Sequence, residues 1–130
     1  MRMDDVPIGR LMSTDLVTVA ADATAAEAAA RMRDAGVGSV VVVDDDGRLE
    51  GLLTGWDFVR LVRENEPHDE TVVETCMTTD VVTVSETDSL EDLADVVGDD
   101  YSHLPVTDED GVVVGMVSTT DLTGHLAVRR

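Results

Sequence analysis

Residues 51–57 read Gly-Leu-Leu-Thr-Gly-Trp-Asp, and residues 115–121 read Gly-Met-Val-Ser-Thr-Thr-Asp at an offset of 64. Further upstream, residues 11–19 (LMSTDLVTV) align with residues 76–84 (CMTTDVVTV) at an offset of 65. Ordered matches at both ends of a unit indicate an internal repeat. The sequence therefore predicts two copies of one structural unit, with one residue lost from the second copy near the end of its first helix.

Each copy follows the order strand, helix, strand, strand, helix. In the first copy, Thr24 and Glu27 form a capping-box pattern at a helix start, and Gly36 suits the helix end. The Asp46-Gly47 pair favours a hairpin turn, because both residues tolerate positive φ. The first copy is expected to contain a strand at 16–19, a helix at 24–36, hairpin strands at 40–43 and 49–53, and a helix at 55–63.

The second copy repeats this pattern. Apolar residues at helical spacing, namely Leu90, Leu93, Val96 and Val97, predict a helix that ends near Gly98. The second hairpin turn carries another Asp-Gly pair, Asp110-Gly111. The expected elements are a strand at 81–84, this helix, strands at 104–107 and 112–117, and a helix at 119–127.

The domain organisation follows from these repeats. They are expected at residues 6–63 and 71–127, separated by a polar linker at 64–70 that contains Pro67. One such unit cannot cover both faces of its own sheet, whereas two copies about a pseudo-twofold axis can bury each other's sheets. We therefore predict an α/β fold, sandwich-like in its layers, of two β-α-β-β-α repeats with two equivalent clefts between them.

Charge and composition limit the classes of function. The chain carries 28 acidic residues against 9 basic ones, all of them arginine, for a net charge of −19. This balance favours adaptation to high salt over an ordinary acidic cytosolic protein, and it argues against nucleic-acid binding, which needs a basic face. Cys76 is the only cysteine, so the chain cannot form an internal disulfide or a zinc cluster.

The sequence shows no targeting or membrane segment. Residues 1–7 lack the apolar stretch of a signal peptide. The longest apolar run at an expected strand, residues 40–43, is too short to cross a membrane. We expect a cytoplasmic protein that makes no membrane contact and has no metal site.

The repeated Gly-x-x-Thr/Ser-x-x-Asp motif offers both a chemical and a structural interpretation. Its hydroxyl, from Thr54 or Ser118, lies where a strand ends and a helix begins, and can bond a phosphate there. Its carboxylate, from Asp57 or Asp121, can accept two hydrogen bonds from a ribose diol. The same spacing is also a helix-capping signature. The sequence leaves both interpretations open.

Taken together, these motifs resemble the cystathionine β-synthase (CBS) domains, which occur as tandem pairs called Bateman modules. The resemblance spans about residues 6–127 and also rests on His103-Leu104-Pro105-Val106 before an acidic turn. Members of this family bind AMP, ADP, ATP, S-adenosylmethionine or NAD-like ligands between the repeats. The resemblance thus implies adenosine-ligand binding with no required cofactor.

The resemblance also implies that each cleft takes residues from both repeats. One cleft would combine Ser118, Thr120 and Asp121 with Thr14, Asp15, Leu16, Val17, Gly38 and Ser39. The other would combine Thr54 and Asp57 with Thr79, Asp80, Val81, Val82 and His103.

The two clefts depart from the family pattern in different ways. The first carries Ser39 where a basic group is usual, so an uncharged or positive ligand tail, as in S-adenosylmethionine, suits it. The second has Trp56 where a hydroxyl is expected, and AMP or ATP would need His103 or Arg10. For Trp56 we favour a packed helix residue over ligand stacking. His103 is either a phosphate contact or an ordinary exposed histidine.

Three functions compete. We favour a regulatory sensor that binds an adenosine-containing ligand and signals to a separate effector protein or a second copy of itself. The resemblance implies homodimers that pair through helices at 55–63 and 119–127, where Leu61, Val62, Leu122 and Leu126 are available. The alternative is a ligand-free dimerisation scaffold. An enzyme is least favoured, because no nucleophile and base are suitably spaced.

Overall fold

The computed structural model describes residues 6–67, 69–89, 92 and 103–118. The chain divides into two compact units, Leu16–Val81 and Met1–Asp15 with Val82–Arg130. These units are not the two sequence repeats, because residues 71–81 group with the sheet of the first repeat. The division into repeats at 6–63 and 71–127 remains a prediction about the repeating unit of sequence.

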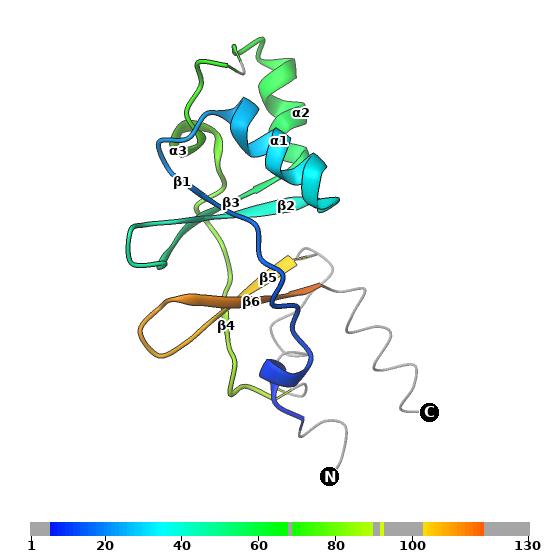
Figure 1. Cartoon of the computed structure of the whole chain (residues 1–130), viewed down its shortest axis with the longest axis vertical. Helices are drawn as coiled ribbons and strands as arrows, with labels where there is room; N and C mark the ends of the chain where they lie inside the picture. Colours follow the sequence, from blue (N-terminus) through cyan, green and yellow to red (C-terminus); the bar gives the residue numbers. More distant parts are fainter. Residues whose placement is uncertain (1–5, 68, 90–91, 93–102, 119–130) are drawn as a thin grey trace. The chain divides into compact units, whose positions relative to one another are not determined.

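The unit formed by residues 16–81 contains a three-stranded mixed sheet. Strands β1 (Thr18–Ala20), β2 (Ser39–Val43) and β3 (Leu49–Thr54) lie in that order, with β1 parallel and β3 antiparallel to β2. Helices α1 (Ala25–Ala35) and α2 (Gly55–Arg63) lie on one face of this sheet, near the short helix α3 (Val73–Cys76) (Figure 1). The core between helices and sheet consists of Val19, Ala25, Ala28, Val40, Val42, Leu53, Leu61, Val73 and Cys76.

Helix α1 begins and ends as the sequence predicts. The hydroxyl of Thr24 accepts the backbone N–H of Glu27 at 3.1 Å, and the Glu27 carboxylate accepts the backbone N–H of Thr24 at 3.4 Å. Gly36 caps the C-terminus in the left-handed region, with φ of 68°. The capping box and the glycine stop are both confirmed.

The hairpin turn is built differently from the expected tight turn. Only Gly47 adopts positive φ, at 83°, while Asp46 does not. The carboxylate of Asp44 instead accepts the backbone N–H groups of Asp46 and Arg48, each at 2.9 Å. The aspartates therefore hold the turn through their side chains, and the sheet register shifts beside it, between Val42 and Val43.

The second unit contains an equivalent sheet. Strands β4 (Val84–Ser85), β5 (His103–Thr107) and β6 (Val113–Ser118) lie in that order, with β4 parallel and β6 antiparallel to β5. The 3₁₀ helix η2 (Ile8–Arg10) contributes the fully buried Ile8 to a core with Val84, Leu104, Val106 and Val117. The hairpin turn of the second unit matches that of the first. The Asp108 carboxylate accepts the backbone N–H groups of Asp110 and Val112, and Gly111 has φ of 85°.

The α/β class is confirmed, and the structure differs from the expected elements in two local ways. Strand β1 begins two residues later than predicted and β4 three residues later. Ahead of β1, the Val17 carbonyl accepts one hydrogen bond, from the Val41 N–H at 2.9 Å. The sequence also missed α3, which is too short to show helical periodicity. The helices predicted to end at Gly98 and to span 119–127 lie outside the described residues. No helix within the described ranges is long and apolar enough to cross a membrane.

Candidate functional site

The predicted site residues Thr54 and Asp57 lie where β3 ends and α2 begins. Thr54 is the N-cap of α2, and Asp57 completes a capping box with it. One carboxylate oxygen of Asp57, Oδ2, accepts the Thr54 backbone N–H at 2.8 Å and its hydroxyl at 3.4 Å. The capping interpretation of the motif is therefore confirmed for this copy. The ligand interpretation remains a prediction.

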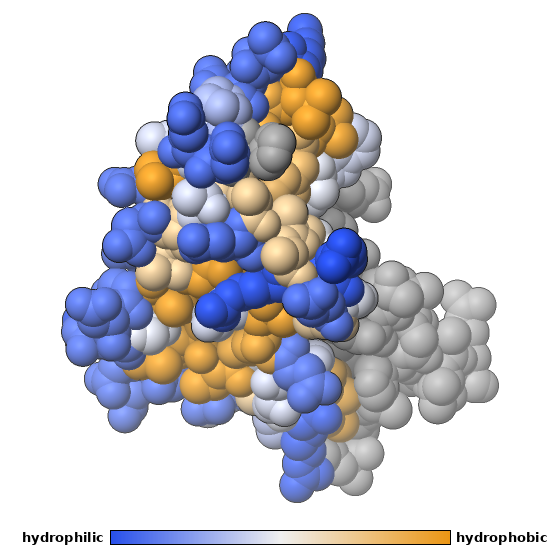
Figure 2. Space-filling model, turned by 45° about the horizontal axis from the view of Figure 1, so that its top comes forward, coloured by the Kyte–Doolittle hydropathy of each residue, from blue (hydrophilic) through white to orange (hydrophobic). Residues whose placement is uncertain are grey.

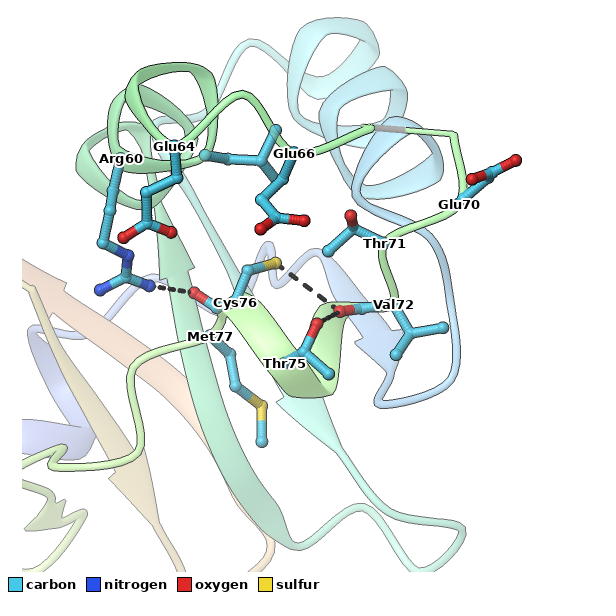
Figure 3. A pocket seen from close by; sticks show the side chains of 10 residues that line it. Arg60, Glu64, Glu66, Glu70, Thr71, Val72, Thr75, Cys76 and Met77 are labelled. Carbon is cyan, nitrogen blue, oxygen red and sulfur yellow. Dashed lines mark hydrogen bonds between the residues drawn. The ribbon is translucent and has the colours of Figure 1, made fainter.

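The other oxygen of Asp57 binds two further side chains. Oδ1 accepts the Thr78 hydroxyl at 3.0 Å and lies 3.3 Å from a guanidinium nitrogen of Arg60. That same nitrogen donates to the Cys76 carbonyl at 2.6 Å, as Figure 3 shows. Asp57 is only 4% exposed, the one charged residue buried in the described ranges. It therefore joins the end of β3, helix α2 and the segment after α3.

The Met77-Thr78 pair, just before the expected first strand of the second repeat, also packs on the motif glycine Gly51. Thr78 and Leu52 exchange backbone hydrogen bonds of 2.8 and 2.9 Å. A Cβ on Gly51 would lie 2.6 Å from the Met77 sulfur and 3.0 Å from the Thr78 carbonyl oxygen. The motif requires glycine here because a neighbouring segment crosses the strand at contact distance.

The second unit repeats this arrangement. Ser13 and Met116 exchange two backbone hydrogen bonds of 2.9 Å each. A Cβ on Gly115 would collide with the Met12 side chain and lie 3.0 Å from the Ser13 carbonyl oxygen. The segment before the first strand of each sequence repeat is therefore held by the same kind of contact.

The predicted residues of the Asp57 cleft divide between the units. Thr79 and Asp80 directly follow Thr78 and are exposed, in the same unit as Thr54 and Asp57. Val82 and the half-buried His103 belong to the other unit. The structure thus brings the motif hydroxyl and carboxylate together with the segment that leads into Thr79.

The predicted residues of the Asp121 cleft are only partly described. Thr14 and Asp15 are exposed and follow Ser13. Ser118 ends β6 and pairs with His103 of β5. Val17 and Ser39 belong to the other unit, while Thr120 and Asp121 lie outside the described residues.

Two expectations about α2 are wrong. Trp56 is 81% exposed, so it is not a packed helix residue, and Leu61 is buried in its own core and unavailable for dimerisation. The positions of Trp56 and Leu61 follow from helical geometry. Asp57 and Leu61 are four residues apart and both buried, so they define the inner face of α2. Trp56, Val59 and Val62 consequently lie outward.

Sequence reasoning also missed Arg60 and Thr78. Arg60 follows Asp57 by three residues on a helix, a spacing at which opposite charges meet. Thr78 follows the Met of the repeated Met-Thr/Ser pair, at the position equivalent to Ser13. These patterns were available in the sequence, but the contact of Thr78 with Asp57 depends on how the chain returns to β3.

A pocket of about 800 Å³ lies beside this cluster. The lining side chains, shown in Figure 3, are Arg60, Leu61, Glu64, Glu66, Glu70, Thr71, Val72, Thr75, Cys76 and Met77. Burial, and secondarily the Asp57 charge, raise the pKa of the Cys76 thiol, while Arg60 lowers it. The thiol therefore stays protonated at neutral pH and is a weak nucleophile.

Metal binding receives no support from the described part of the chain. Within residues 6–67, 69–89, 92 and 103–118, no three His, Cys, Asp or Glu side chains are grouped to hold an ion.

Comparison with known proteins identifies the family of this fold. The CBS domain family model matches residues 8–64 and 73–128. Protein MK0525 of Methanopyrus kandleri is 30% identical over 122 residues, which cover 92% of this chain and 62% of that protein. The homoserine O-acetyltransferase of Methanobrevibacter ruminantium is 35% identical over 117 residues, 89% of this chain and 23% of the enzyme. This chain thus spans less than two thirds of either relative.

Solved structures agree with this assignment. The CBS domain pair of protein MJ0100, in complex with 5′-methylthioadenosine and S-adenosyl-L-methionine, has a TM-score of 0.85 at 24% identity and covers 96% of this chain and 98% of its own. The cytosolic domain of the Mg²⁺ channel MgtE, in complex with ATP, has a TM-score of 0.79 at 31% identity, covering 91% and 48%. The family model matches twice, over most of the chain, and the solved structures share the fold. This chain therefore belongs to the CBS domain family, as a tandem pair known as a Bateman module.

Proposed function

We propose that this chain is a non-catalytic regulatory sensor that binds an adenosine-containing ligand at the predicted clefts and signals to a separate protein. The observation that carries the proposal is the Asp57 cluster. A hydroxyl and a carboxylate at the start of α2 share a unit with the exposed Thr79 and Asp80. Structural relatives hold S-adenosylmethionine, methylthioadenosine or ATP.

Charge favours a ligand without a polyphosphate tail. Arg60 is already bonded to Asp57 and the Cys76 carbonyl, and the exposed Asp80 adds negative charge. A net charge of −19 opposes the approach of ATP. S-adenosylmethionine or methylthioadenosine is therefore preferred over AMP, ADP and ATP.

Thermal unfolding at high salt against a ligand panel tests this function. A ligand that binds only the folded state, at 100 times its dissociation constant, adds about 2.7 kcal/mol of stability. We expect a rise in Tm with S-adenosylmethionine or methylthioadenosine, a smaller rise with ATP and none with GTP. No shift with any adenosine compound at millimolar concentration would refute the sensor.

Matched variants assign the binding to the clefts. Asp57→Asn and Asp121→Asn should each reduce the ligand-induced Tm shift, since each removes a carboxylate predicted to bind ribose. Asp34→Asn on α1 should leave the shift unchanged, because the exposed Asp34 carboxylate pairs with its neighbour Arg33 at 3.8 Å and is not a predicted ligand contact. An unchanged shift in both cleft variants would place the ligand elsewhere.

A dimerisation scaffold remains the second candidate, and one observation favours it. Trp56, Val59 and Val62 are 81%, 56% and 74% exposed on the outer face of α2. Figure 2 shows hydrophobic patches lying among hydrophilic side chains on one face of the molecule. Large apolar side chains grouped on one helix mark an interaction surface, and a second copy of this chain would cover them.

Sedimentation analysis tests this dimer. Val62→Glu should convert the dimer to monomer, because it places a charge within the apolar contact, whereas Glu64→Gln should not. Trp56, the only tryptophan, reports independently: its fluorescence should shift to the red on dilution as the interface opens. A monomer at every concentration would exclude this candidate.

A further inference from the structure

The carboxylate of Asp57 is fully engaged in this structure. Thr54 donates to Oδ2 through its backbone N–H and its hydroxyl, while Thr78 and Arg60 approach Oδ1. An ionised carboxylate offers about four acceptor positions. With 4% of the residue exposed, a ribose diol can bond this carboxylate only by replacing a donor already present.

Two of these donors are costly to remove. The Thr54 backbone N–H lies at the helix start, where an N–H without a partner destabilises the helix. The Arg60 guanidinium balances a buried charge, and leaving that charge unpaired is strongly unfavourable. Arg60 is also held in place by its 2.6 Å bond to the Cys76 carbonyl.

The Thr78 hydroxyl differs from these two donors and from the Thr54 hydroxyl, which bonds the other oxygen, Oδ2, and belongs to the capping box of α2. It is a neutral donor, so a ribose hydroxyl replaces it with a group of the same kind and leaves the charge balance unchanged. Its departure needs only a rotation about χ1, because the Thr78 backbone stays bonded to Leu52 through two hydrogen bonds. Threonine adopts more than one χ1 rotamer readily.

We propose that Thr78 is a positioning residue that masks Asp57, and that a ribose diol binds by replacing the Thr78 hydroxyl on Oδ1. This inference rests on the proposed adenosine-binding function and names the donor that the ligand displaces. The apparent affinity for adenosine is the intrinsic affinity multiplied by the fraction of molecules in which the Thr78 hydroxyl has left the carboxylate. Removing the hydroxyl should therefore tighten binding.

The test compares Thr78→Val with its parent by calorimetric titration. Both proteins carry Asp121→Asn, so that the Asp57 cleft alone reports. Adenosine should bind Thr78→Val about tenfold more tightly, the order of effect of one hydrogen bond to a charged group. The affinity for 2′,3′-dideoxyadenosine, which has no diol, should not change.

Two controls isolate the hydroxyl. Thr78→Ser keeps the donor and should bind adenosine like the parent. Thr75→Val removes a hydroxyl that lies in the same segment and donates to the Val72 carbonyl at 2.8 Å, and it should have no effect. If Thr78→Val does not fold, methyl NMR of the parent replaces it: adenosine should shift the Thr78 methyl resonance and leave that of Thr75 in place.

The outcomes distinguish the masking role of Thr78 from the proposed adenosine-binding function. Equal or weaker adenosine binding by Thr78→Val, with the parent binding normally, or an unmoved Thr78 methyl, overturns the masking role and leaves the sensor intact. Tighter binding of dideoxyadenosine as well would also overturn it, since the effect would not depend on the diol. Failure of both proteins to bind adenosine overturns this inference, and failure of the chain with Asp121 intact to bind it as well overturns the sensor.

Discussion

The sulfur of Met77 lies against the α-carbon of Gly51, so close that a Cβ there would be 2.6 Å away. The same Cβ would lie 3.0 Å from the Thr78 carbonyl oxygen, so a shift of β3 away from Met77 would bring it against this backbone atom. Gly51→Ala should lower the free energy of unfolding by about 1–3 kcal/mol, the usual cost of overpacking. Urea denaturation measures it.

The control for this prediction is Gly38→Ala. Nothing lies within 4 Å of a Cβ at Gly38, and its φ is not positive. Alanine there should be neutral or should stabilise by about 0.4–1 kcal/mol through the unfolded state. Equal effects at Gly38 and Gly51 would show that the contact with Met77 does not determine the cost.

Asp57→Ala should destabilise the fold far more than Glu27→Ala. Both residues occupy the same capping position, but Glu27 is exposed and Asp57 is buried against Arg60 and Thr78. We expect a loss of about 2–3 kcal/mol for Asp57→Ala and about 0.5 kcal/mol for Glu27→Ala. Similar losses in chemical denaturation would mean that the buried contacts contribute little.

The Cys76 thiol should resist alkylation in the folded protein. Burial raises its pKa, so the folded state keeps the thiol proton at a pH where the unfolded chain has lost it. Unfolding free energy should therefore fall as pH rises above the ordinary thiol pKa, because the unfolded state binds fewer protons there.

Iodoacetamide labelling at pH 8 checks this directly. The rate should be low in buffer and rise with the unfolded fraction in urea. Cys76→Ser supplies the control for the pH effect: its unfolding free energy should lack the decline. Rapid labelling of the native protein would show that the thiol is accessible and ionised.

Salt should stabilise the fold. With 28 acidic and 9 basic residues, self-repulsion is large at low ionic strength, and raising KCl from 0.01 to 1 M shortens the screening length from about 30 Å to about 3 Å. Tm should rise across that range. Chloride is the anion of choice because sulfate also strengthens apolar burial. A flat or falling Tm would mean that the surface charges do not repel appreciably.

Much of the fold could be predicted because its signals are local. The capping box at Thr24, the stop at Gly36 and the bounds of α2 each depend on residues within one helical turn of one another. The apolar runs at 40–43 and 49–53, on either side of the Asp46-Gly47 turn, placed β2 and β3 within one residue. In the second unit, β5 and β6 were equally close.

The rest depended on contacts between distant parts of the chain. Thr78 pairs with Leu52, 26 residues earlier in the chain, and this contact produces no periodic pattern in the sequence. Neither the Asp57 cluster nor the packing of Met77 on Gly51 could therefore be predicted. Trp56 was misplaced because its helix face is set by the burial of Asp57, a charged residue that pattern analysis assigns to the surface.

The chain crosses between its compact units twice, once after Asp15 and once after Val81. The unit at 16–81 is thus nested within the other, like a domain inserted into a host, although the sequence reads as a simple duplication. Two covalent tethers join the units, so any rotation must be accommodated by both at once. Predicted ligand positions lie at both crossings, residues 14–17 at the first and residues 79–82 at the second, so a ligand held by either set would contact a connecting segment.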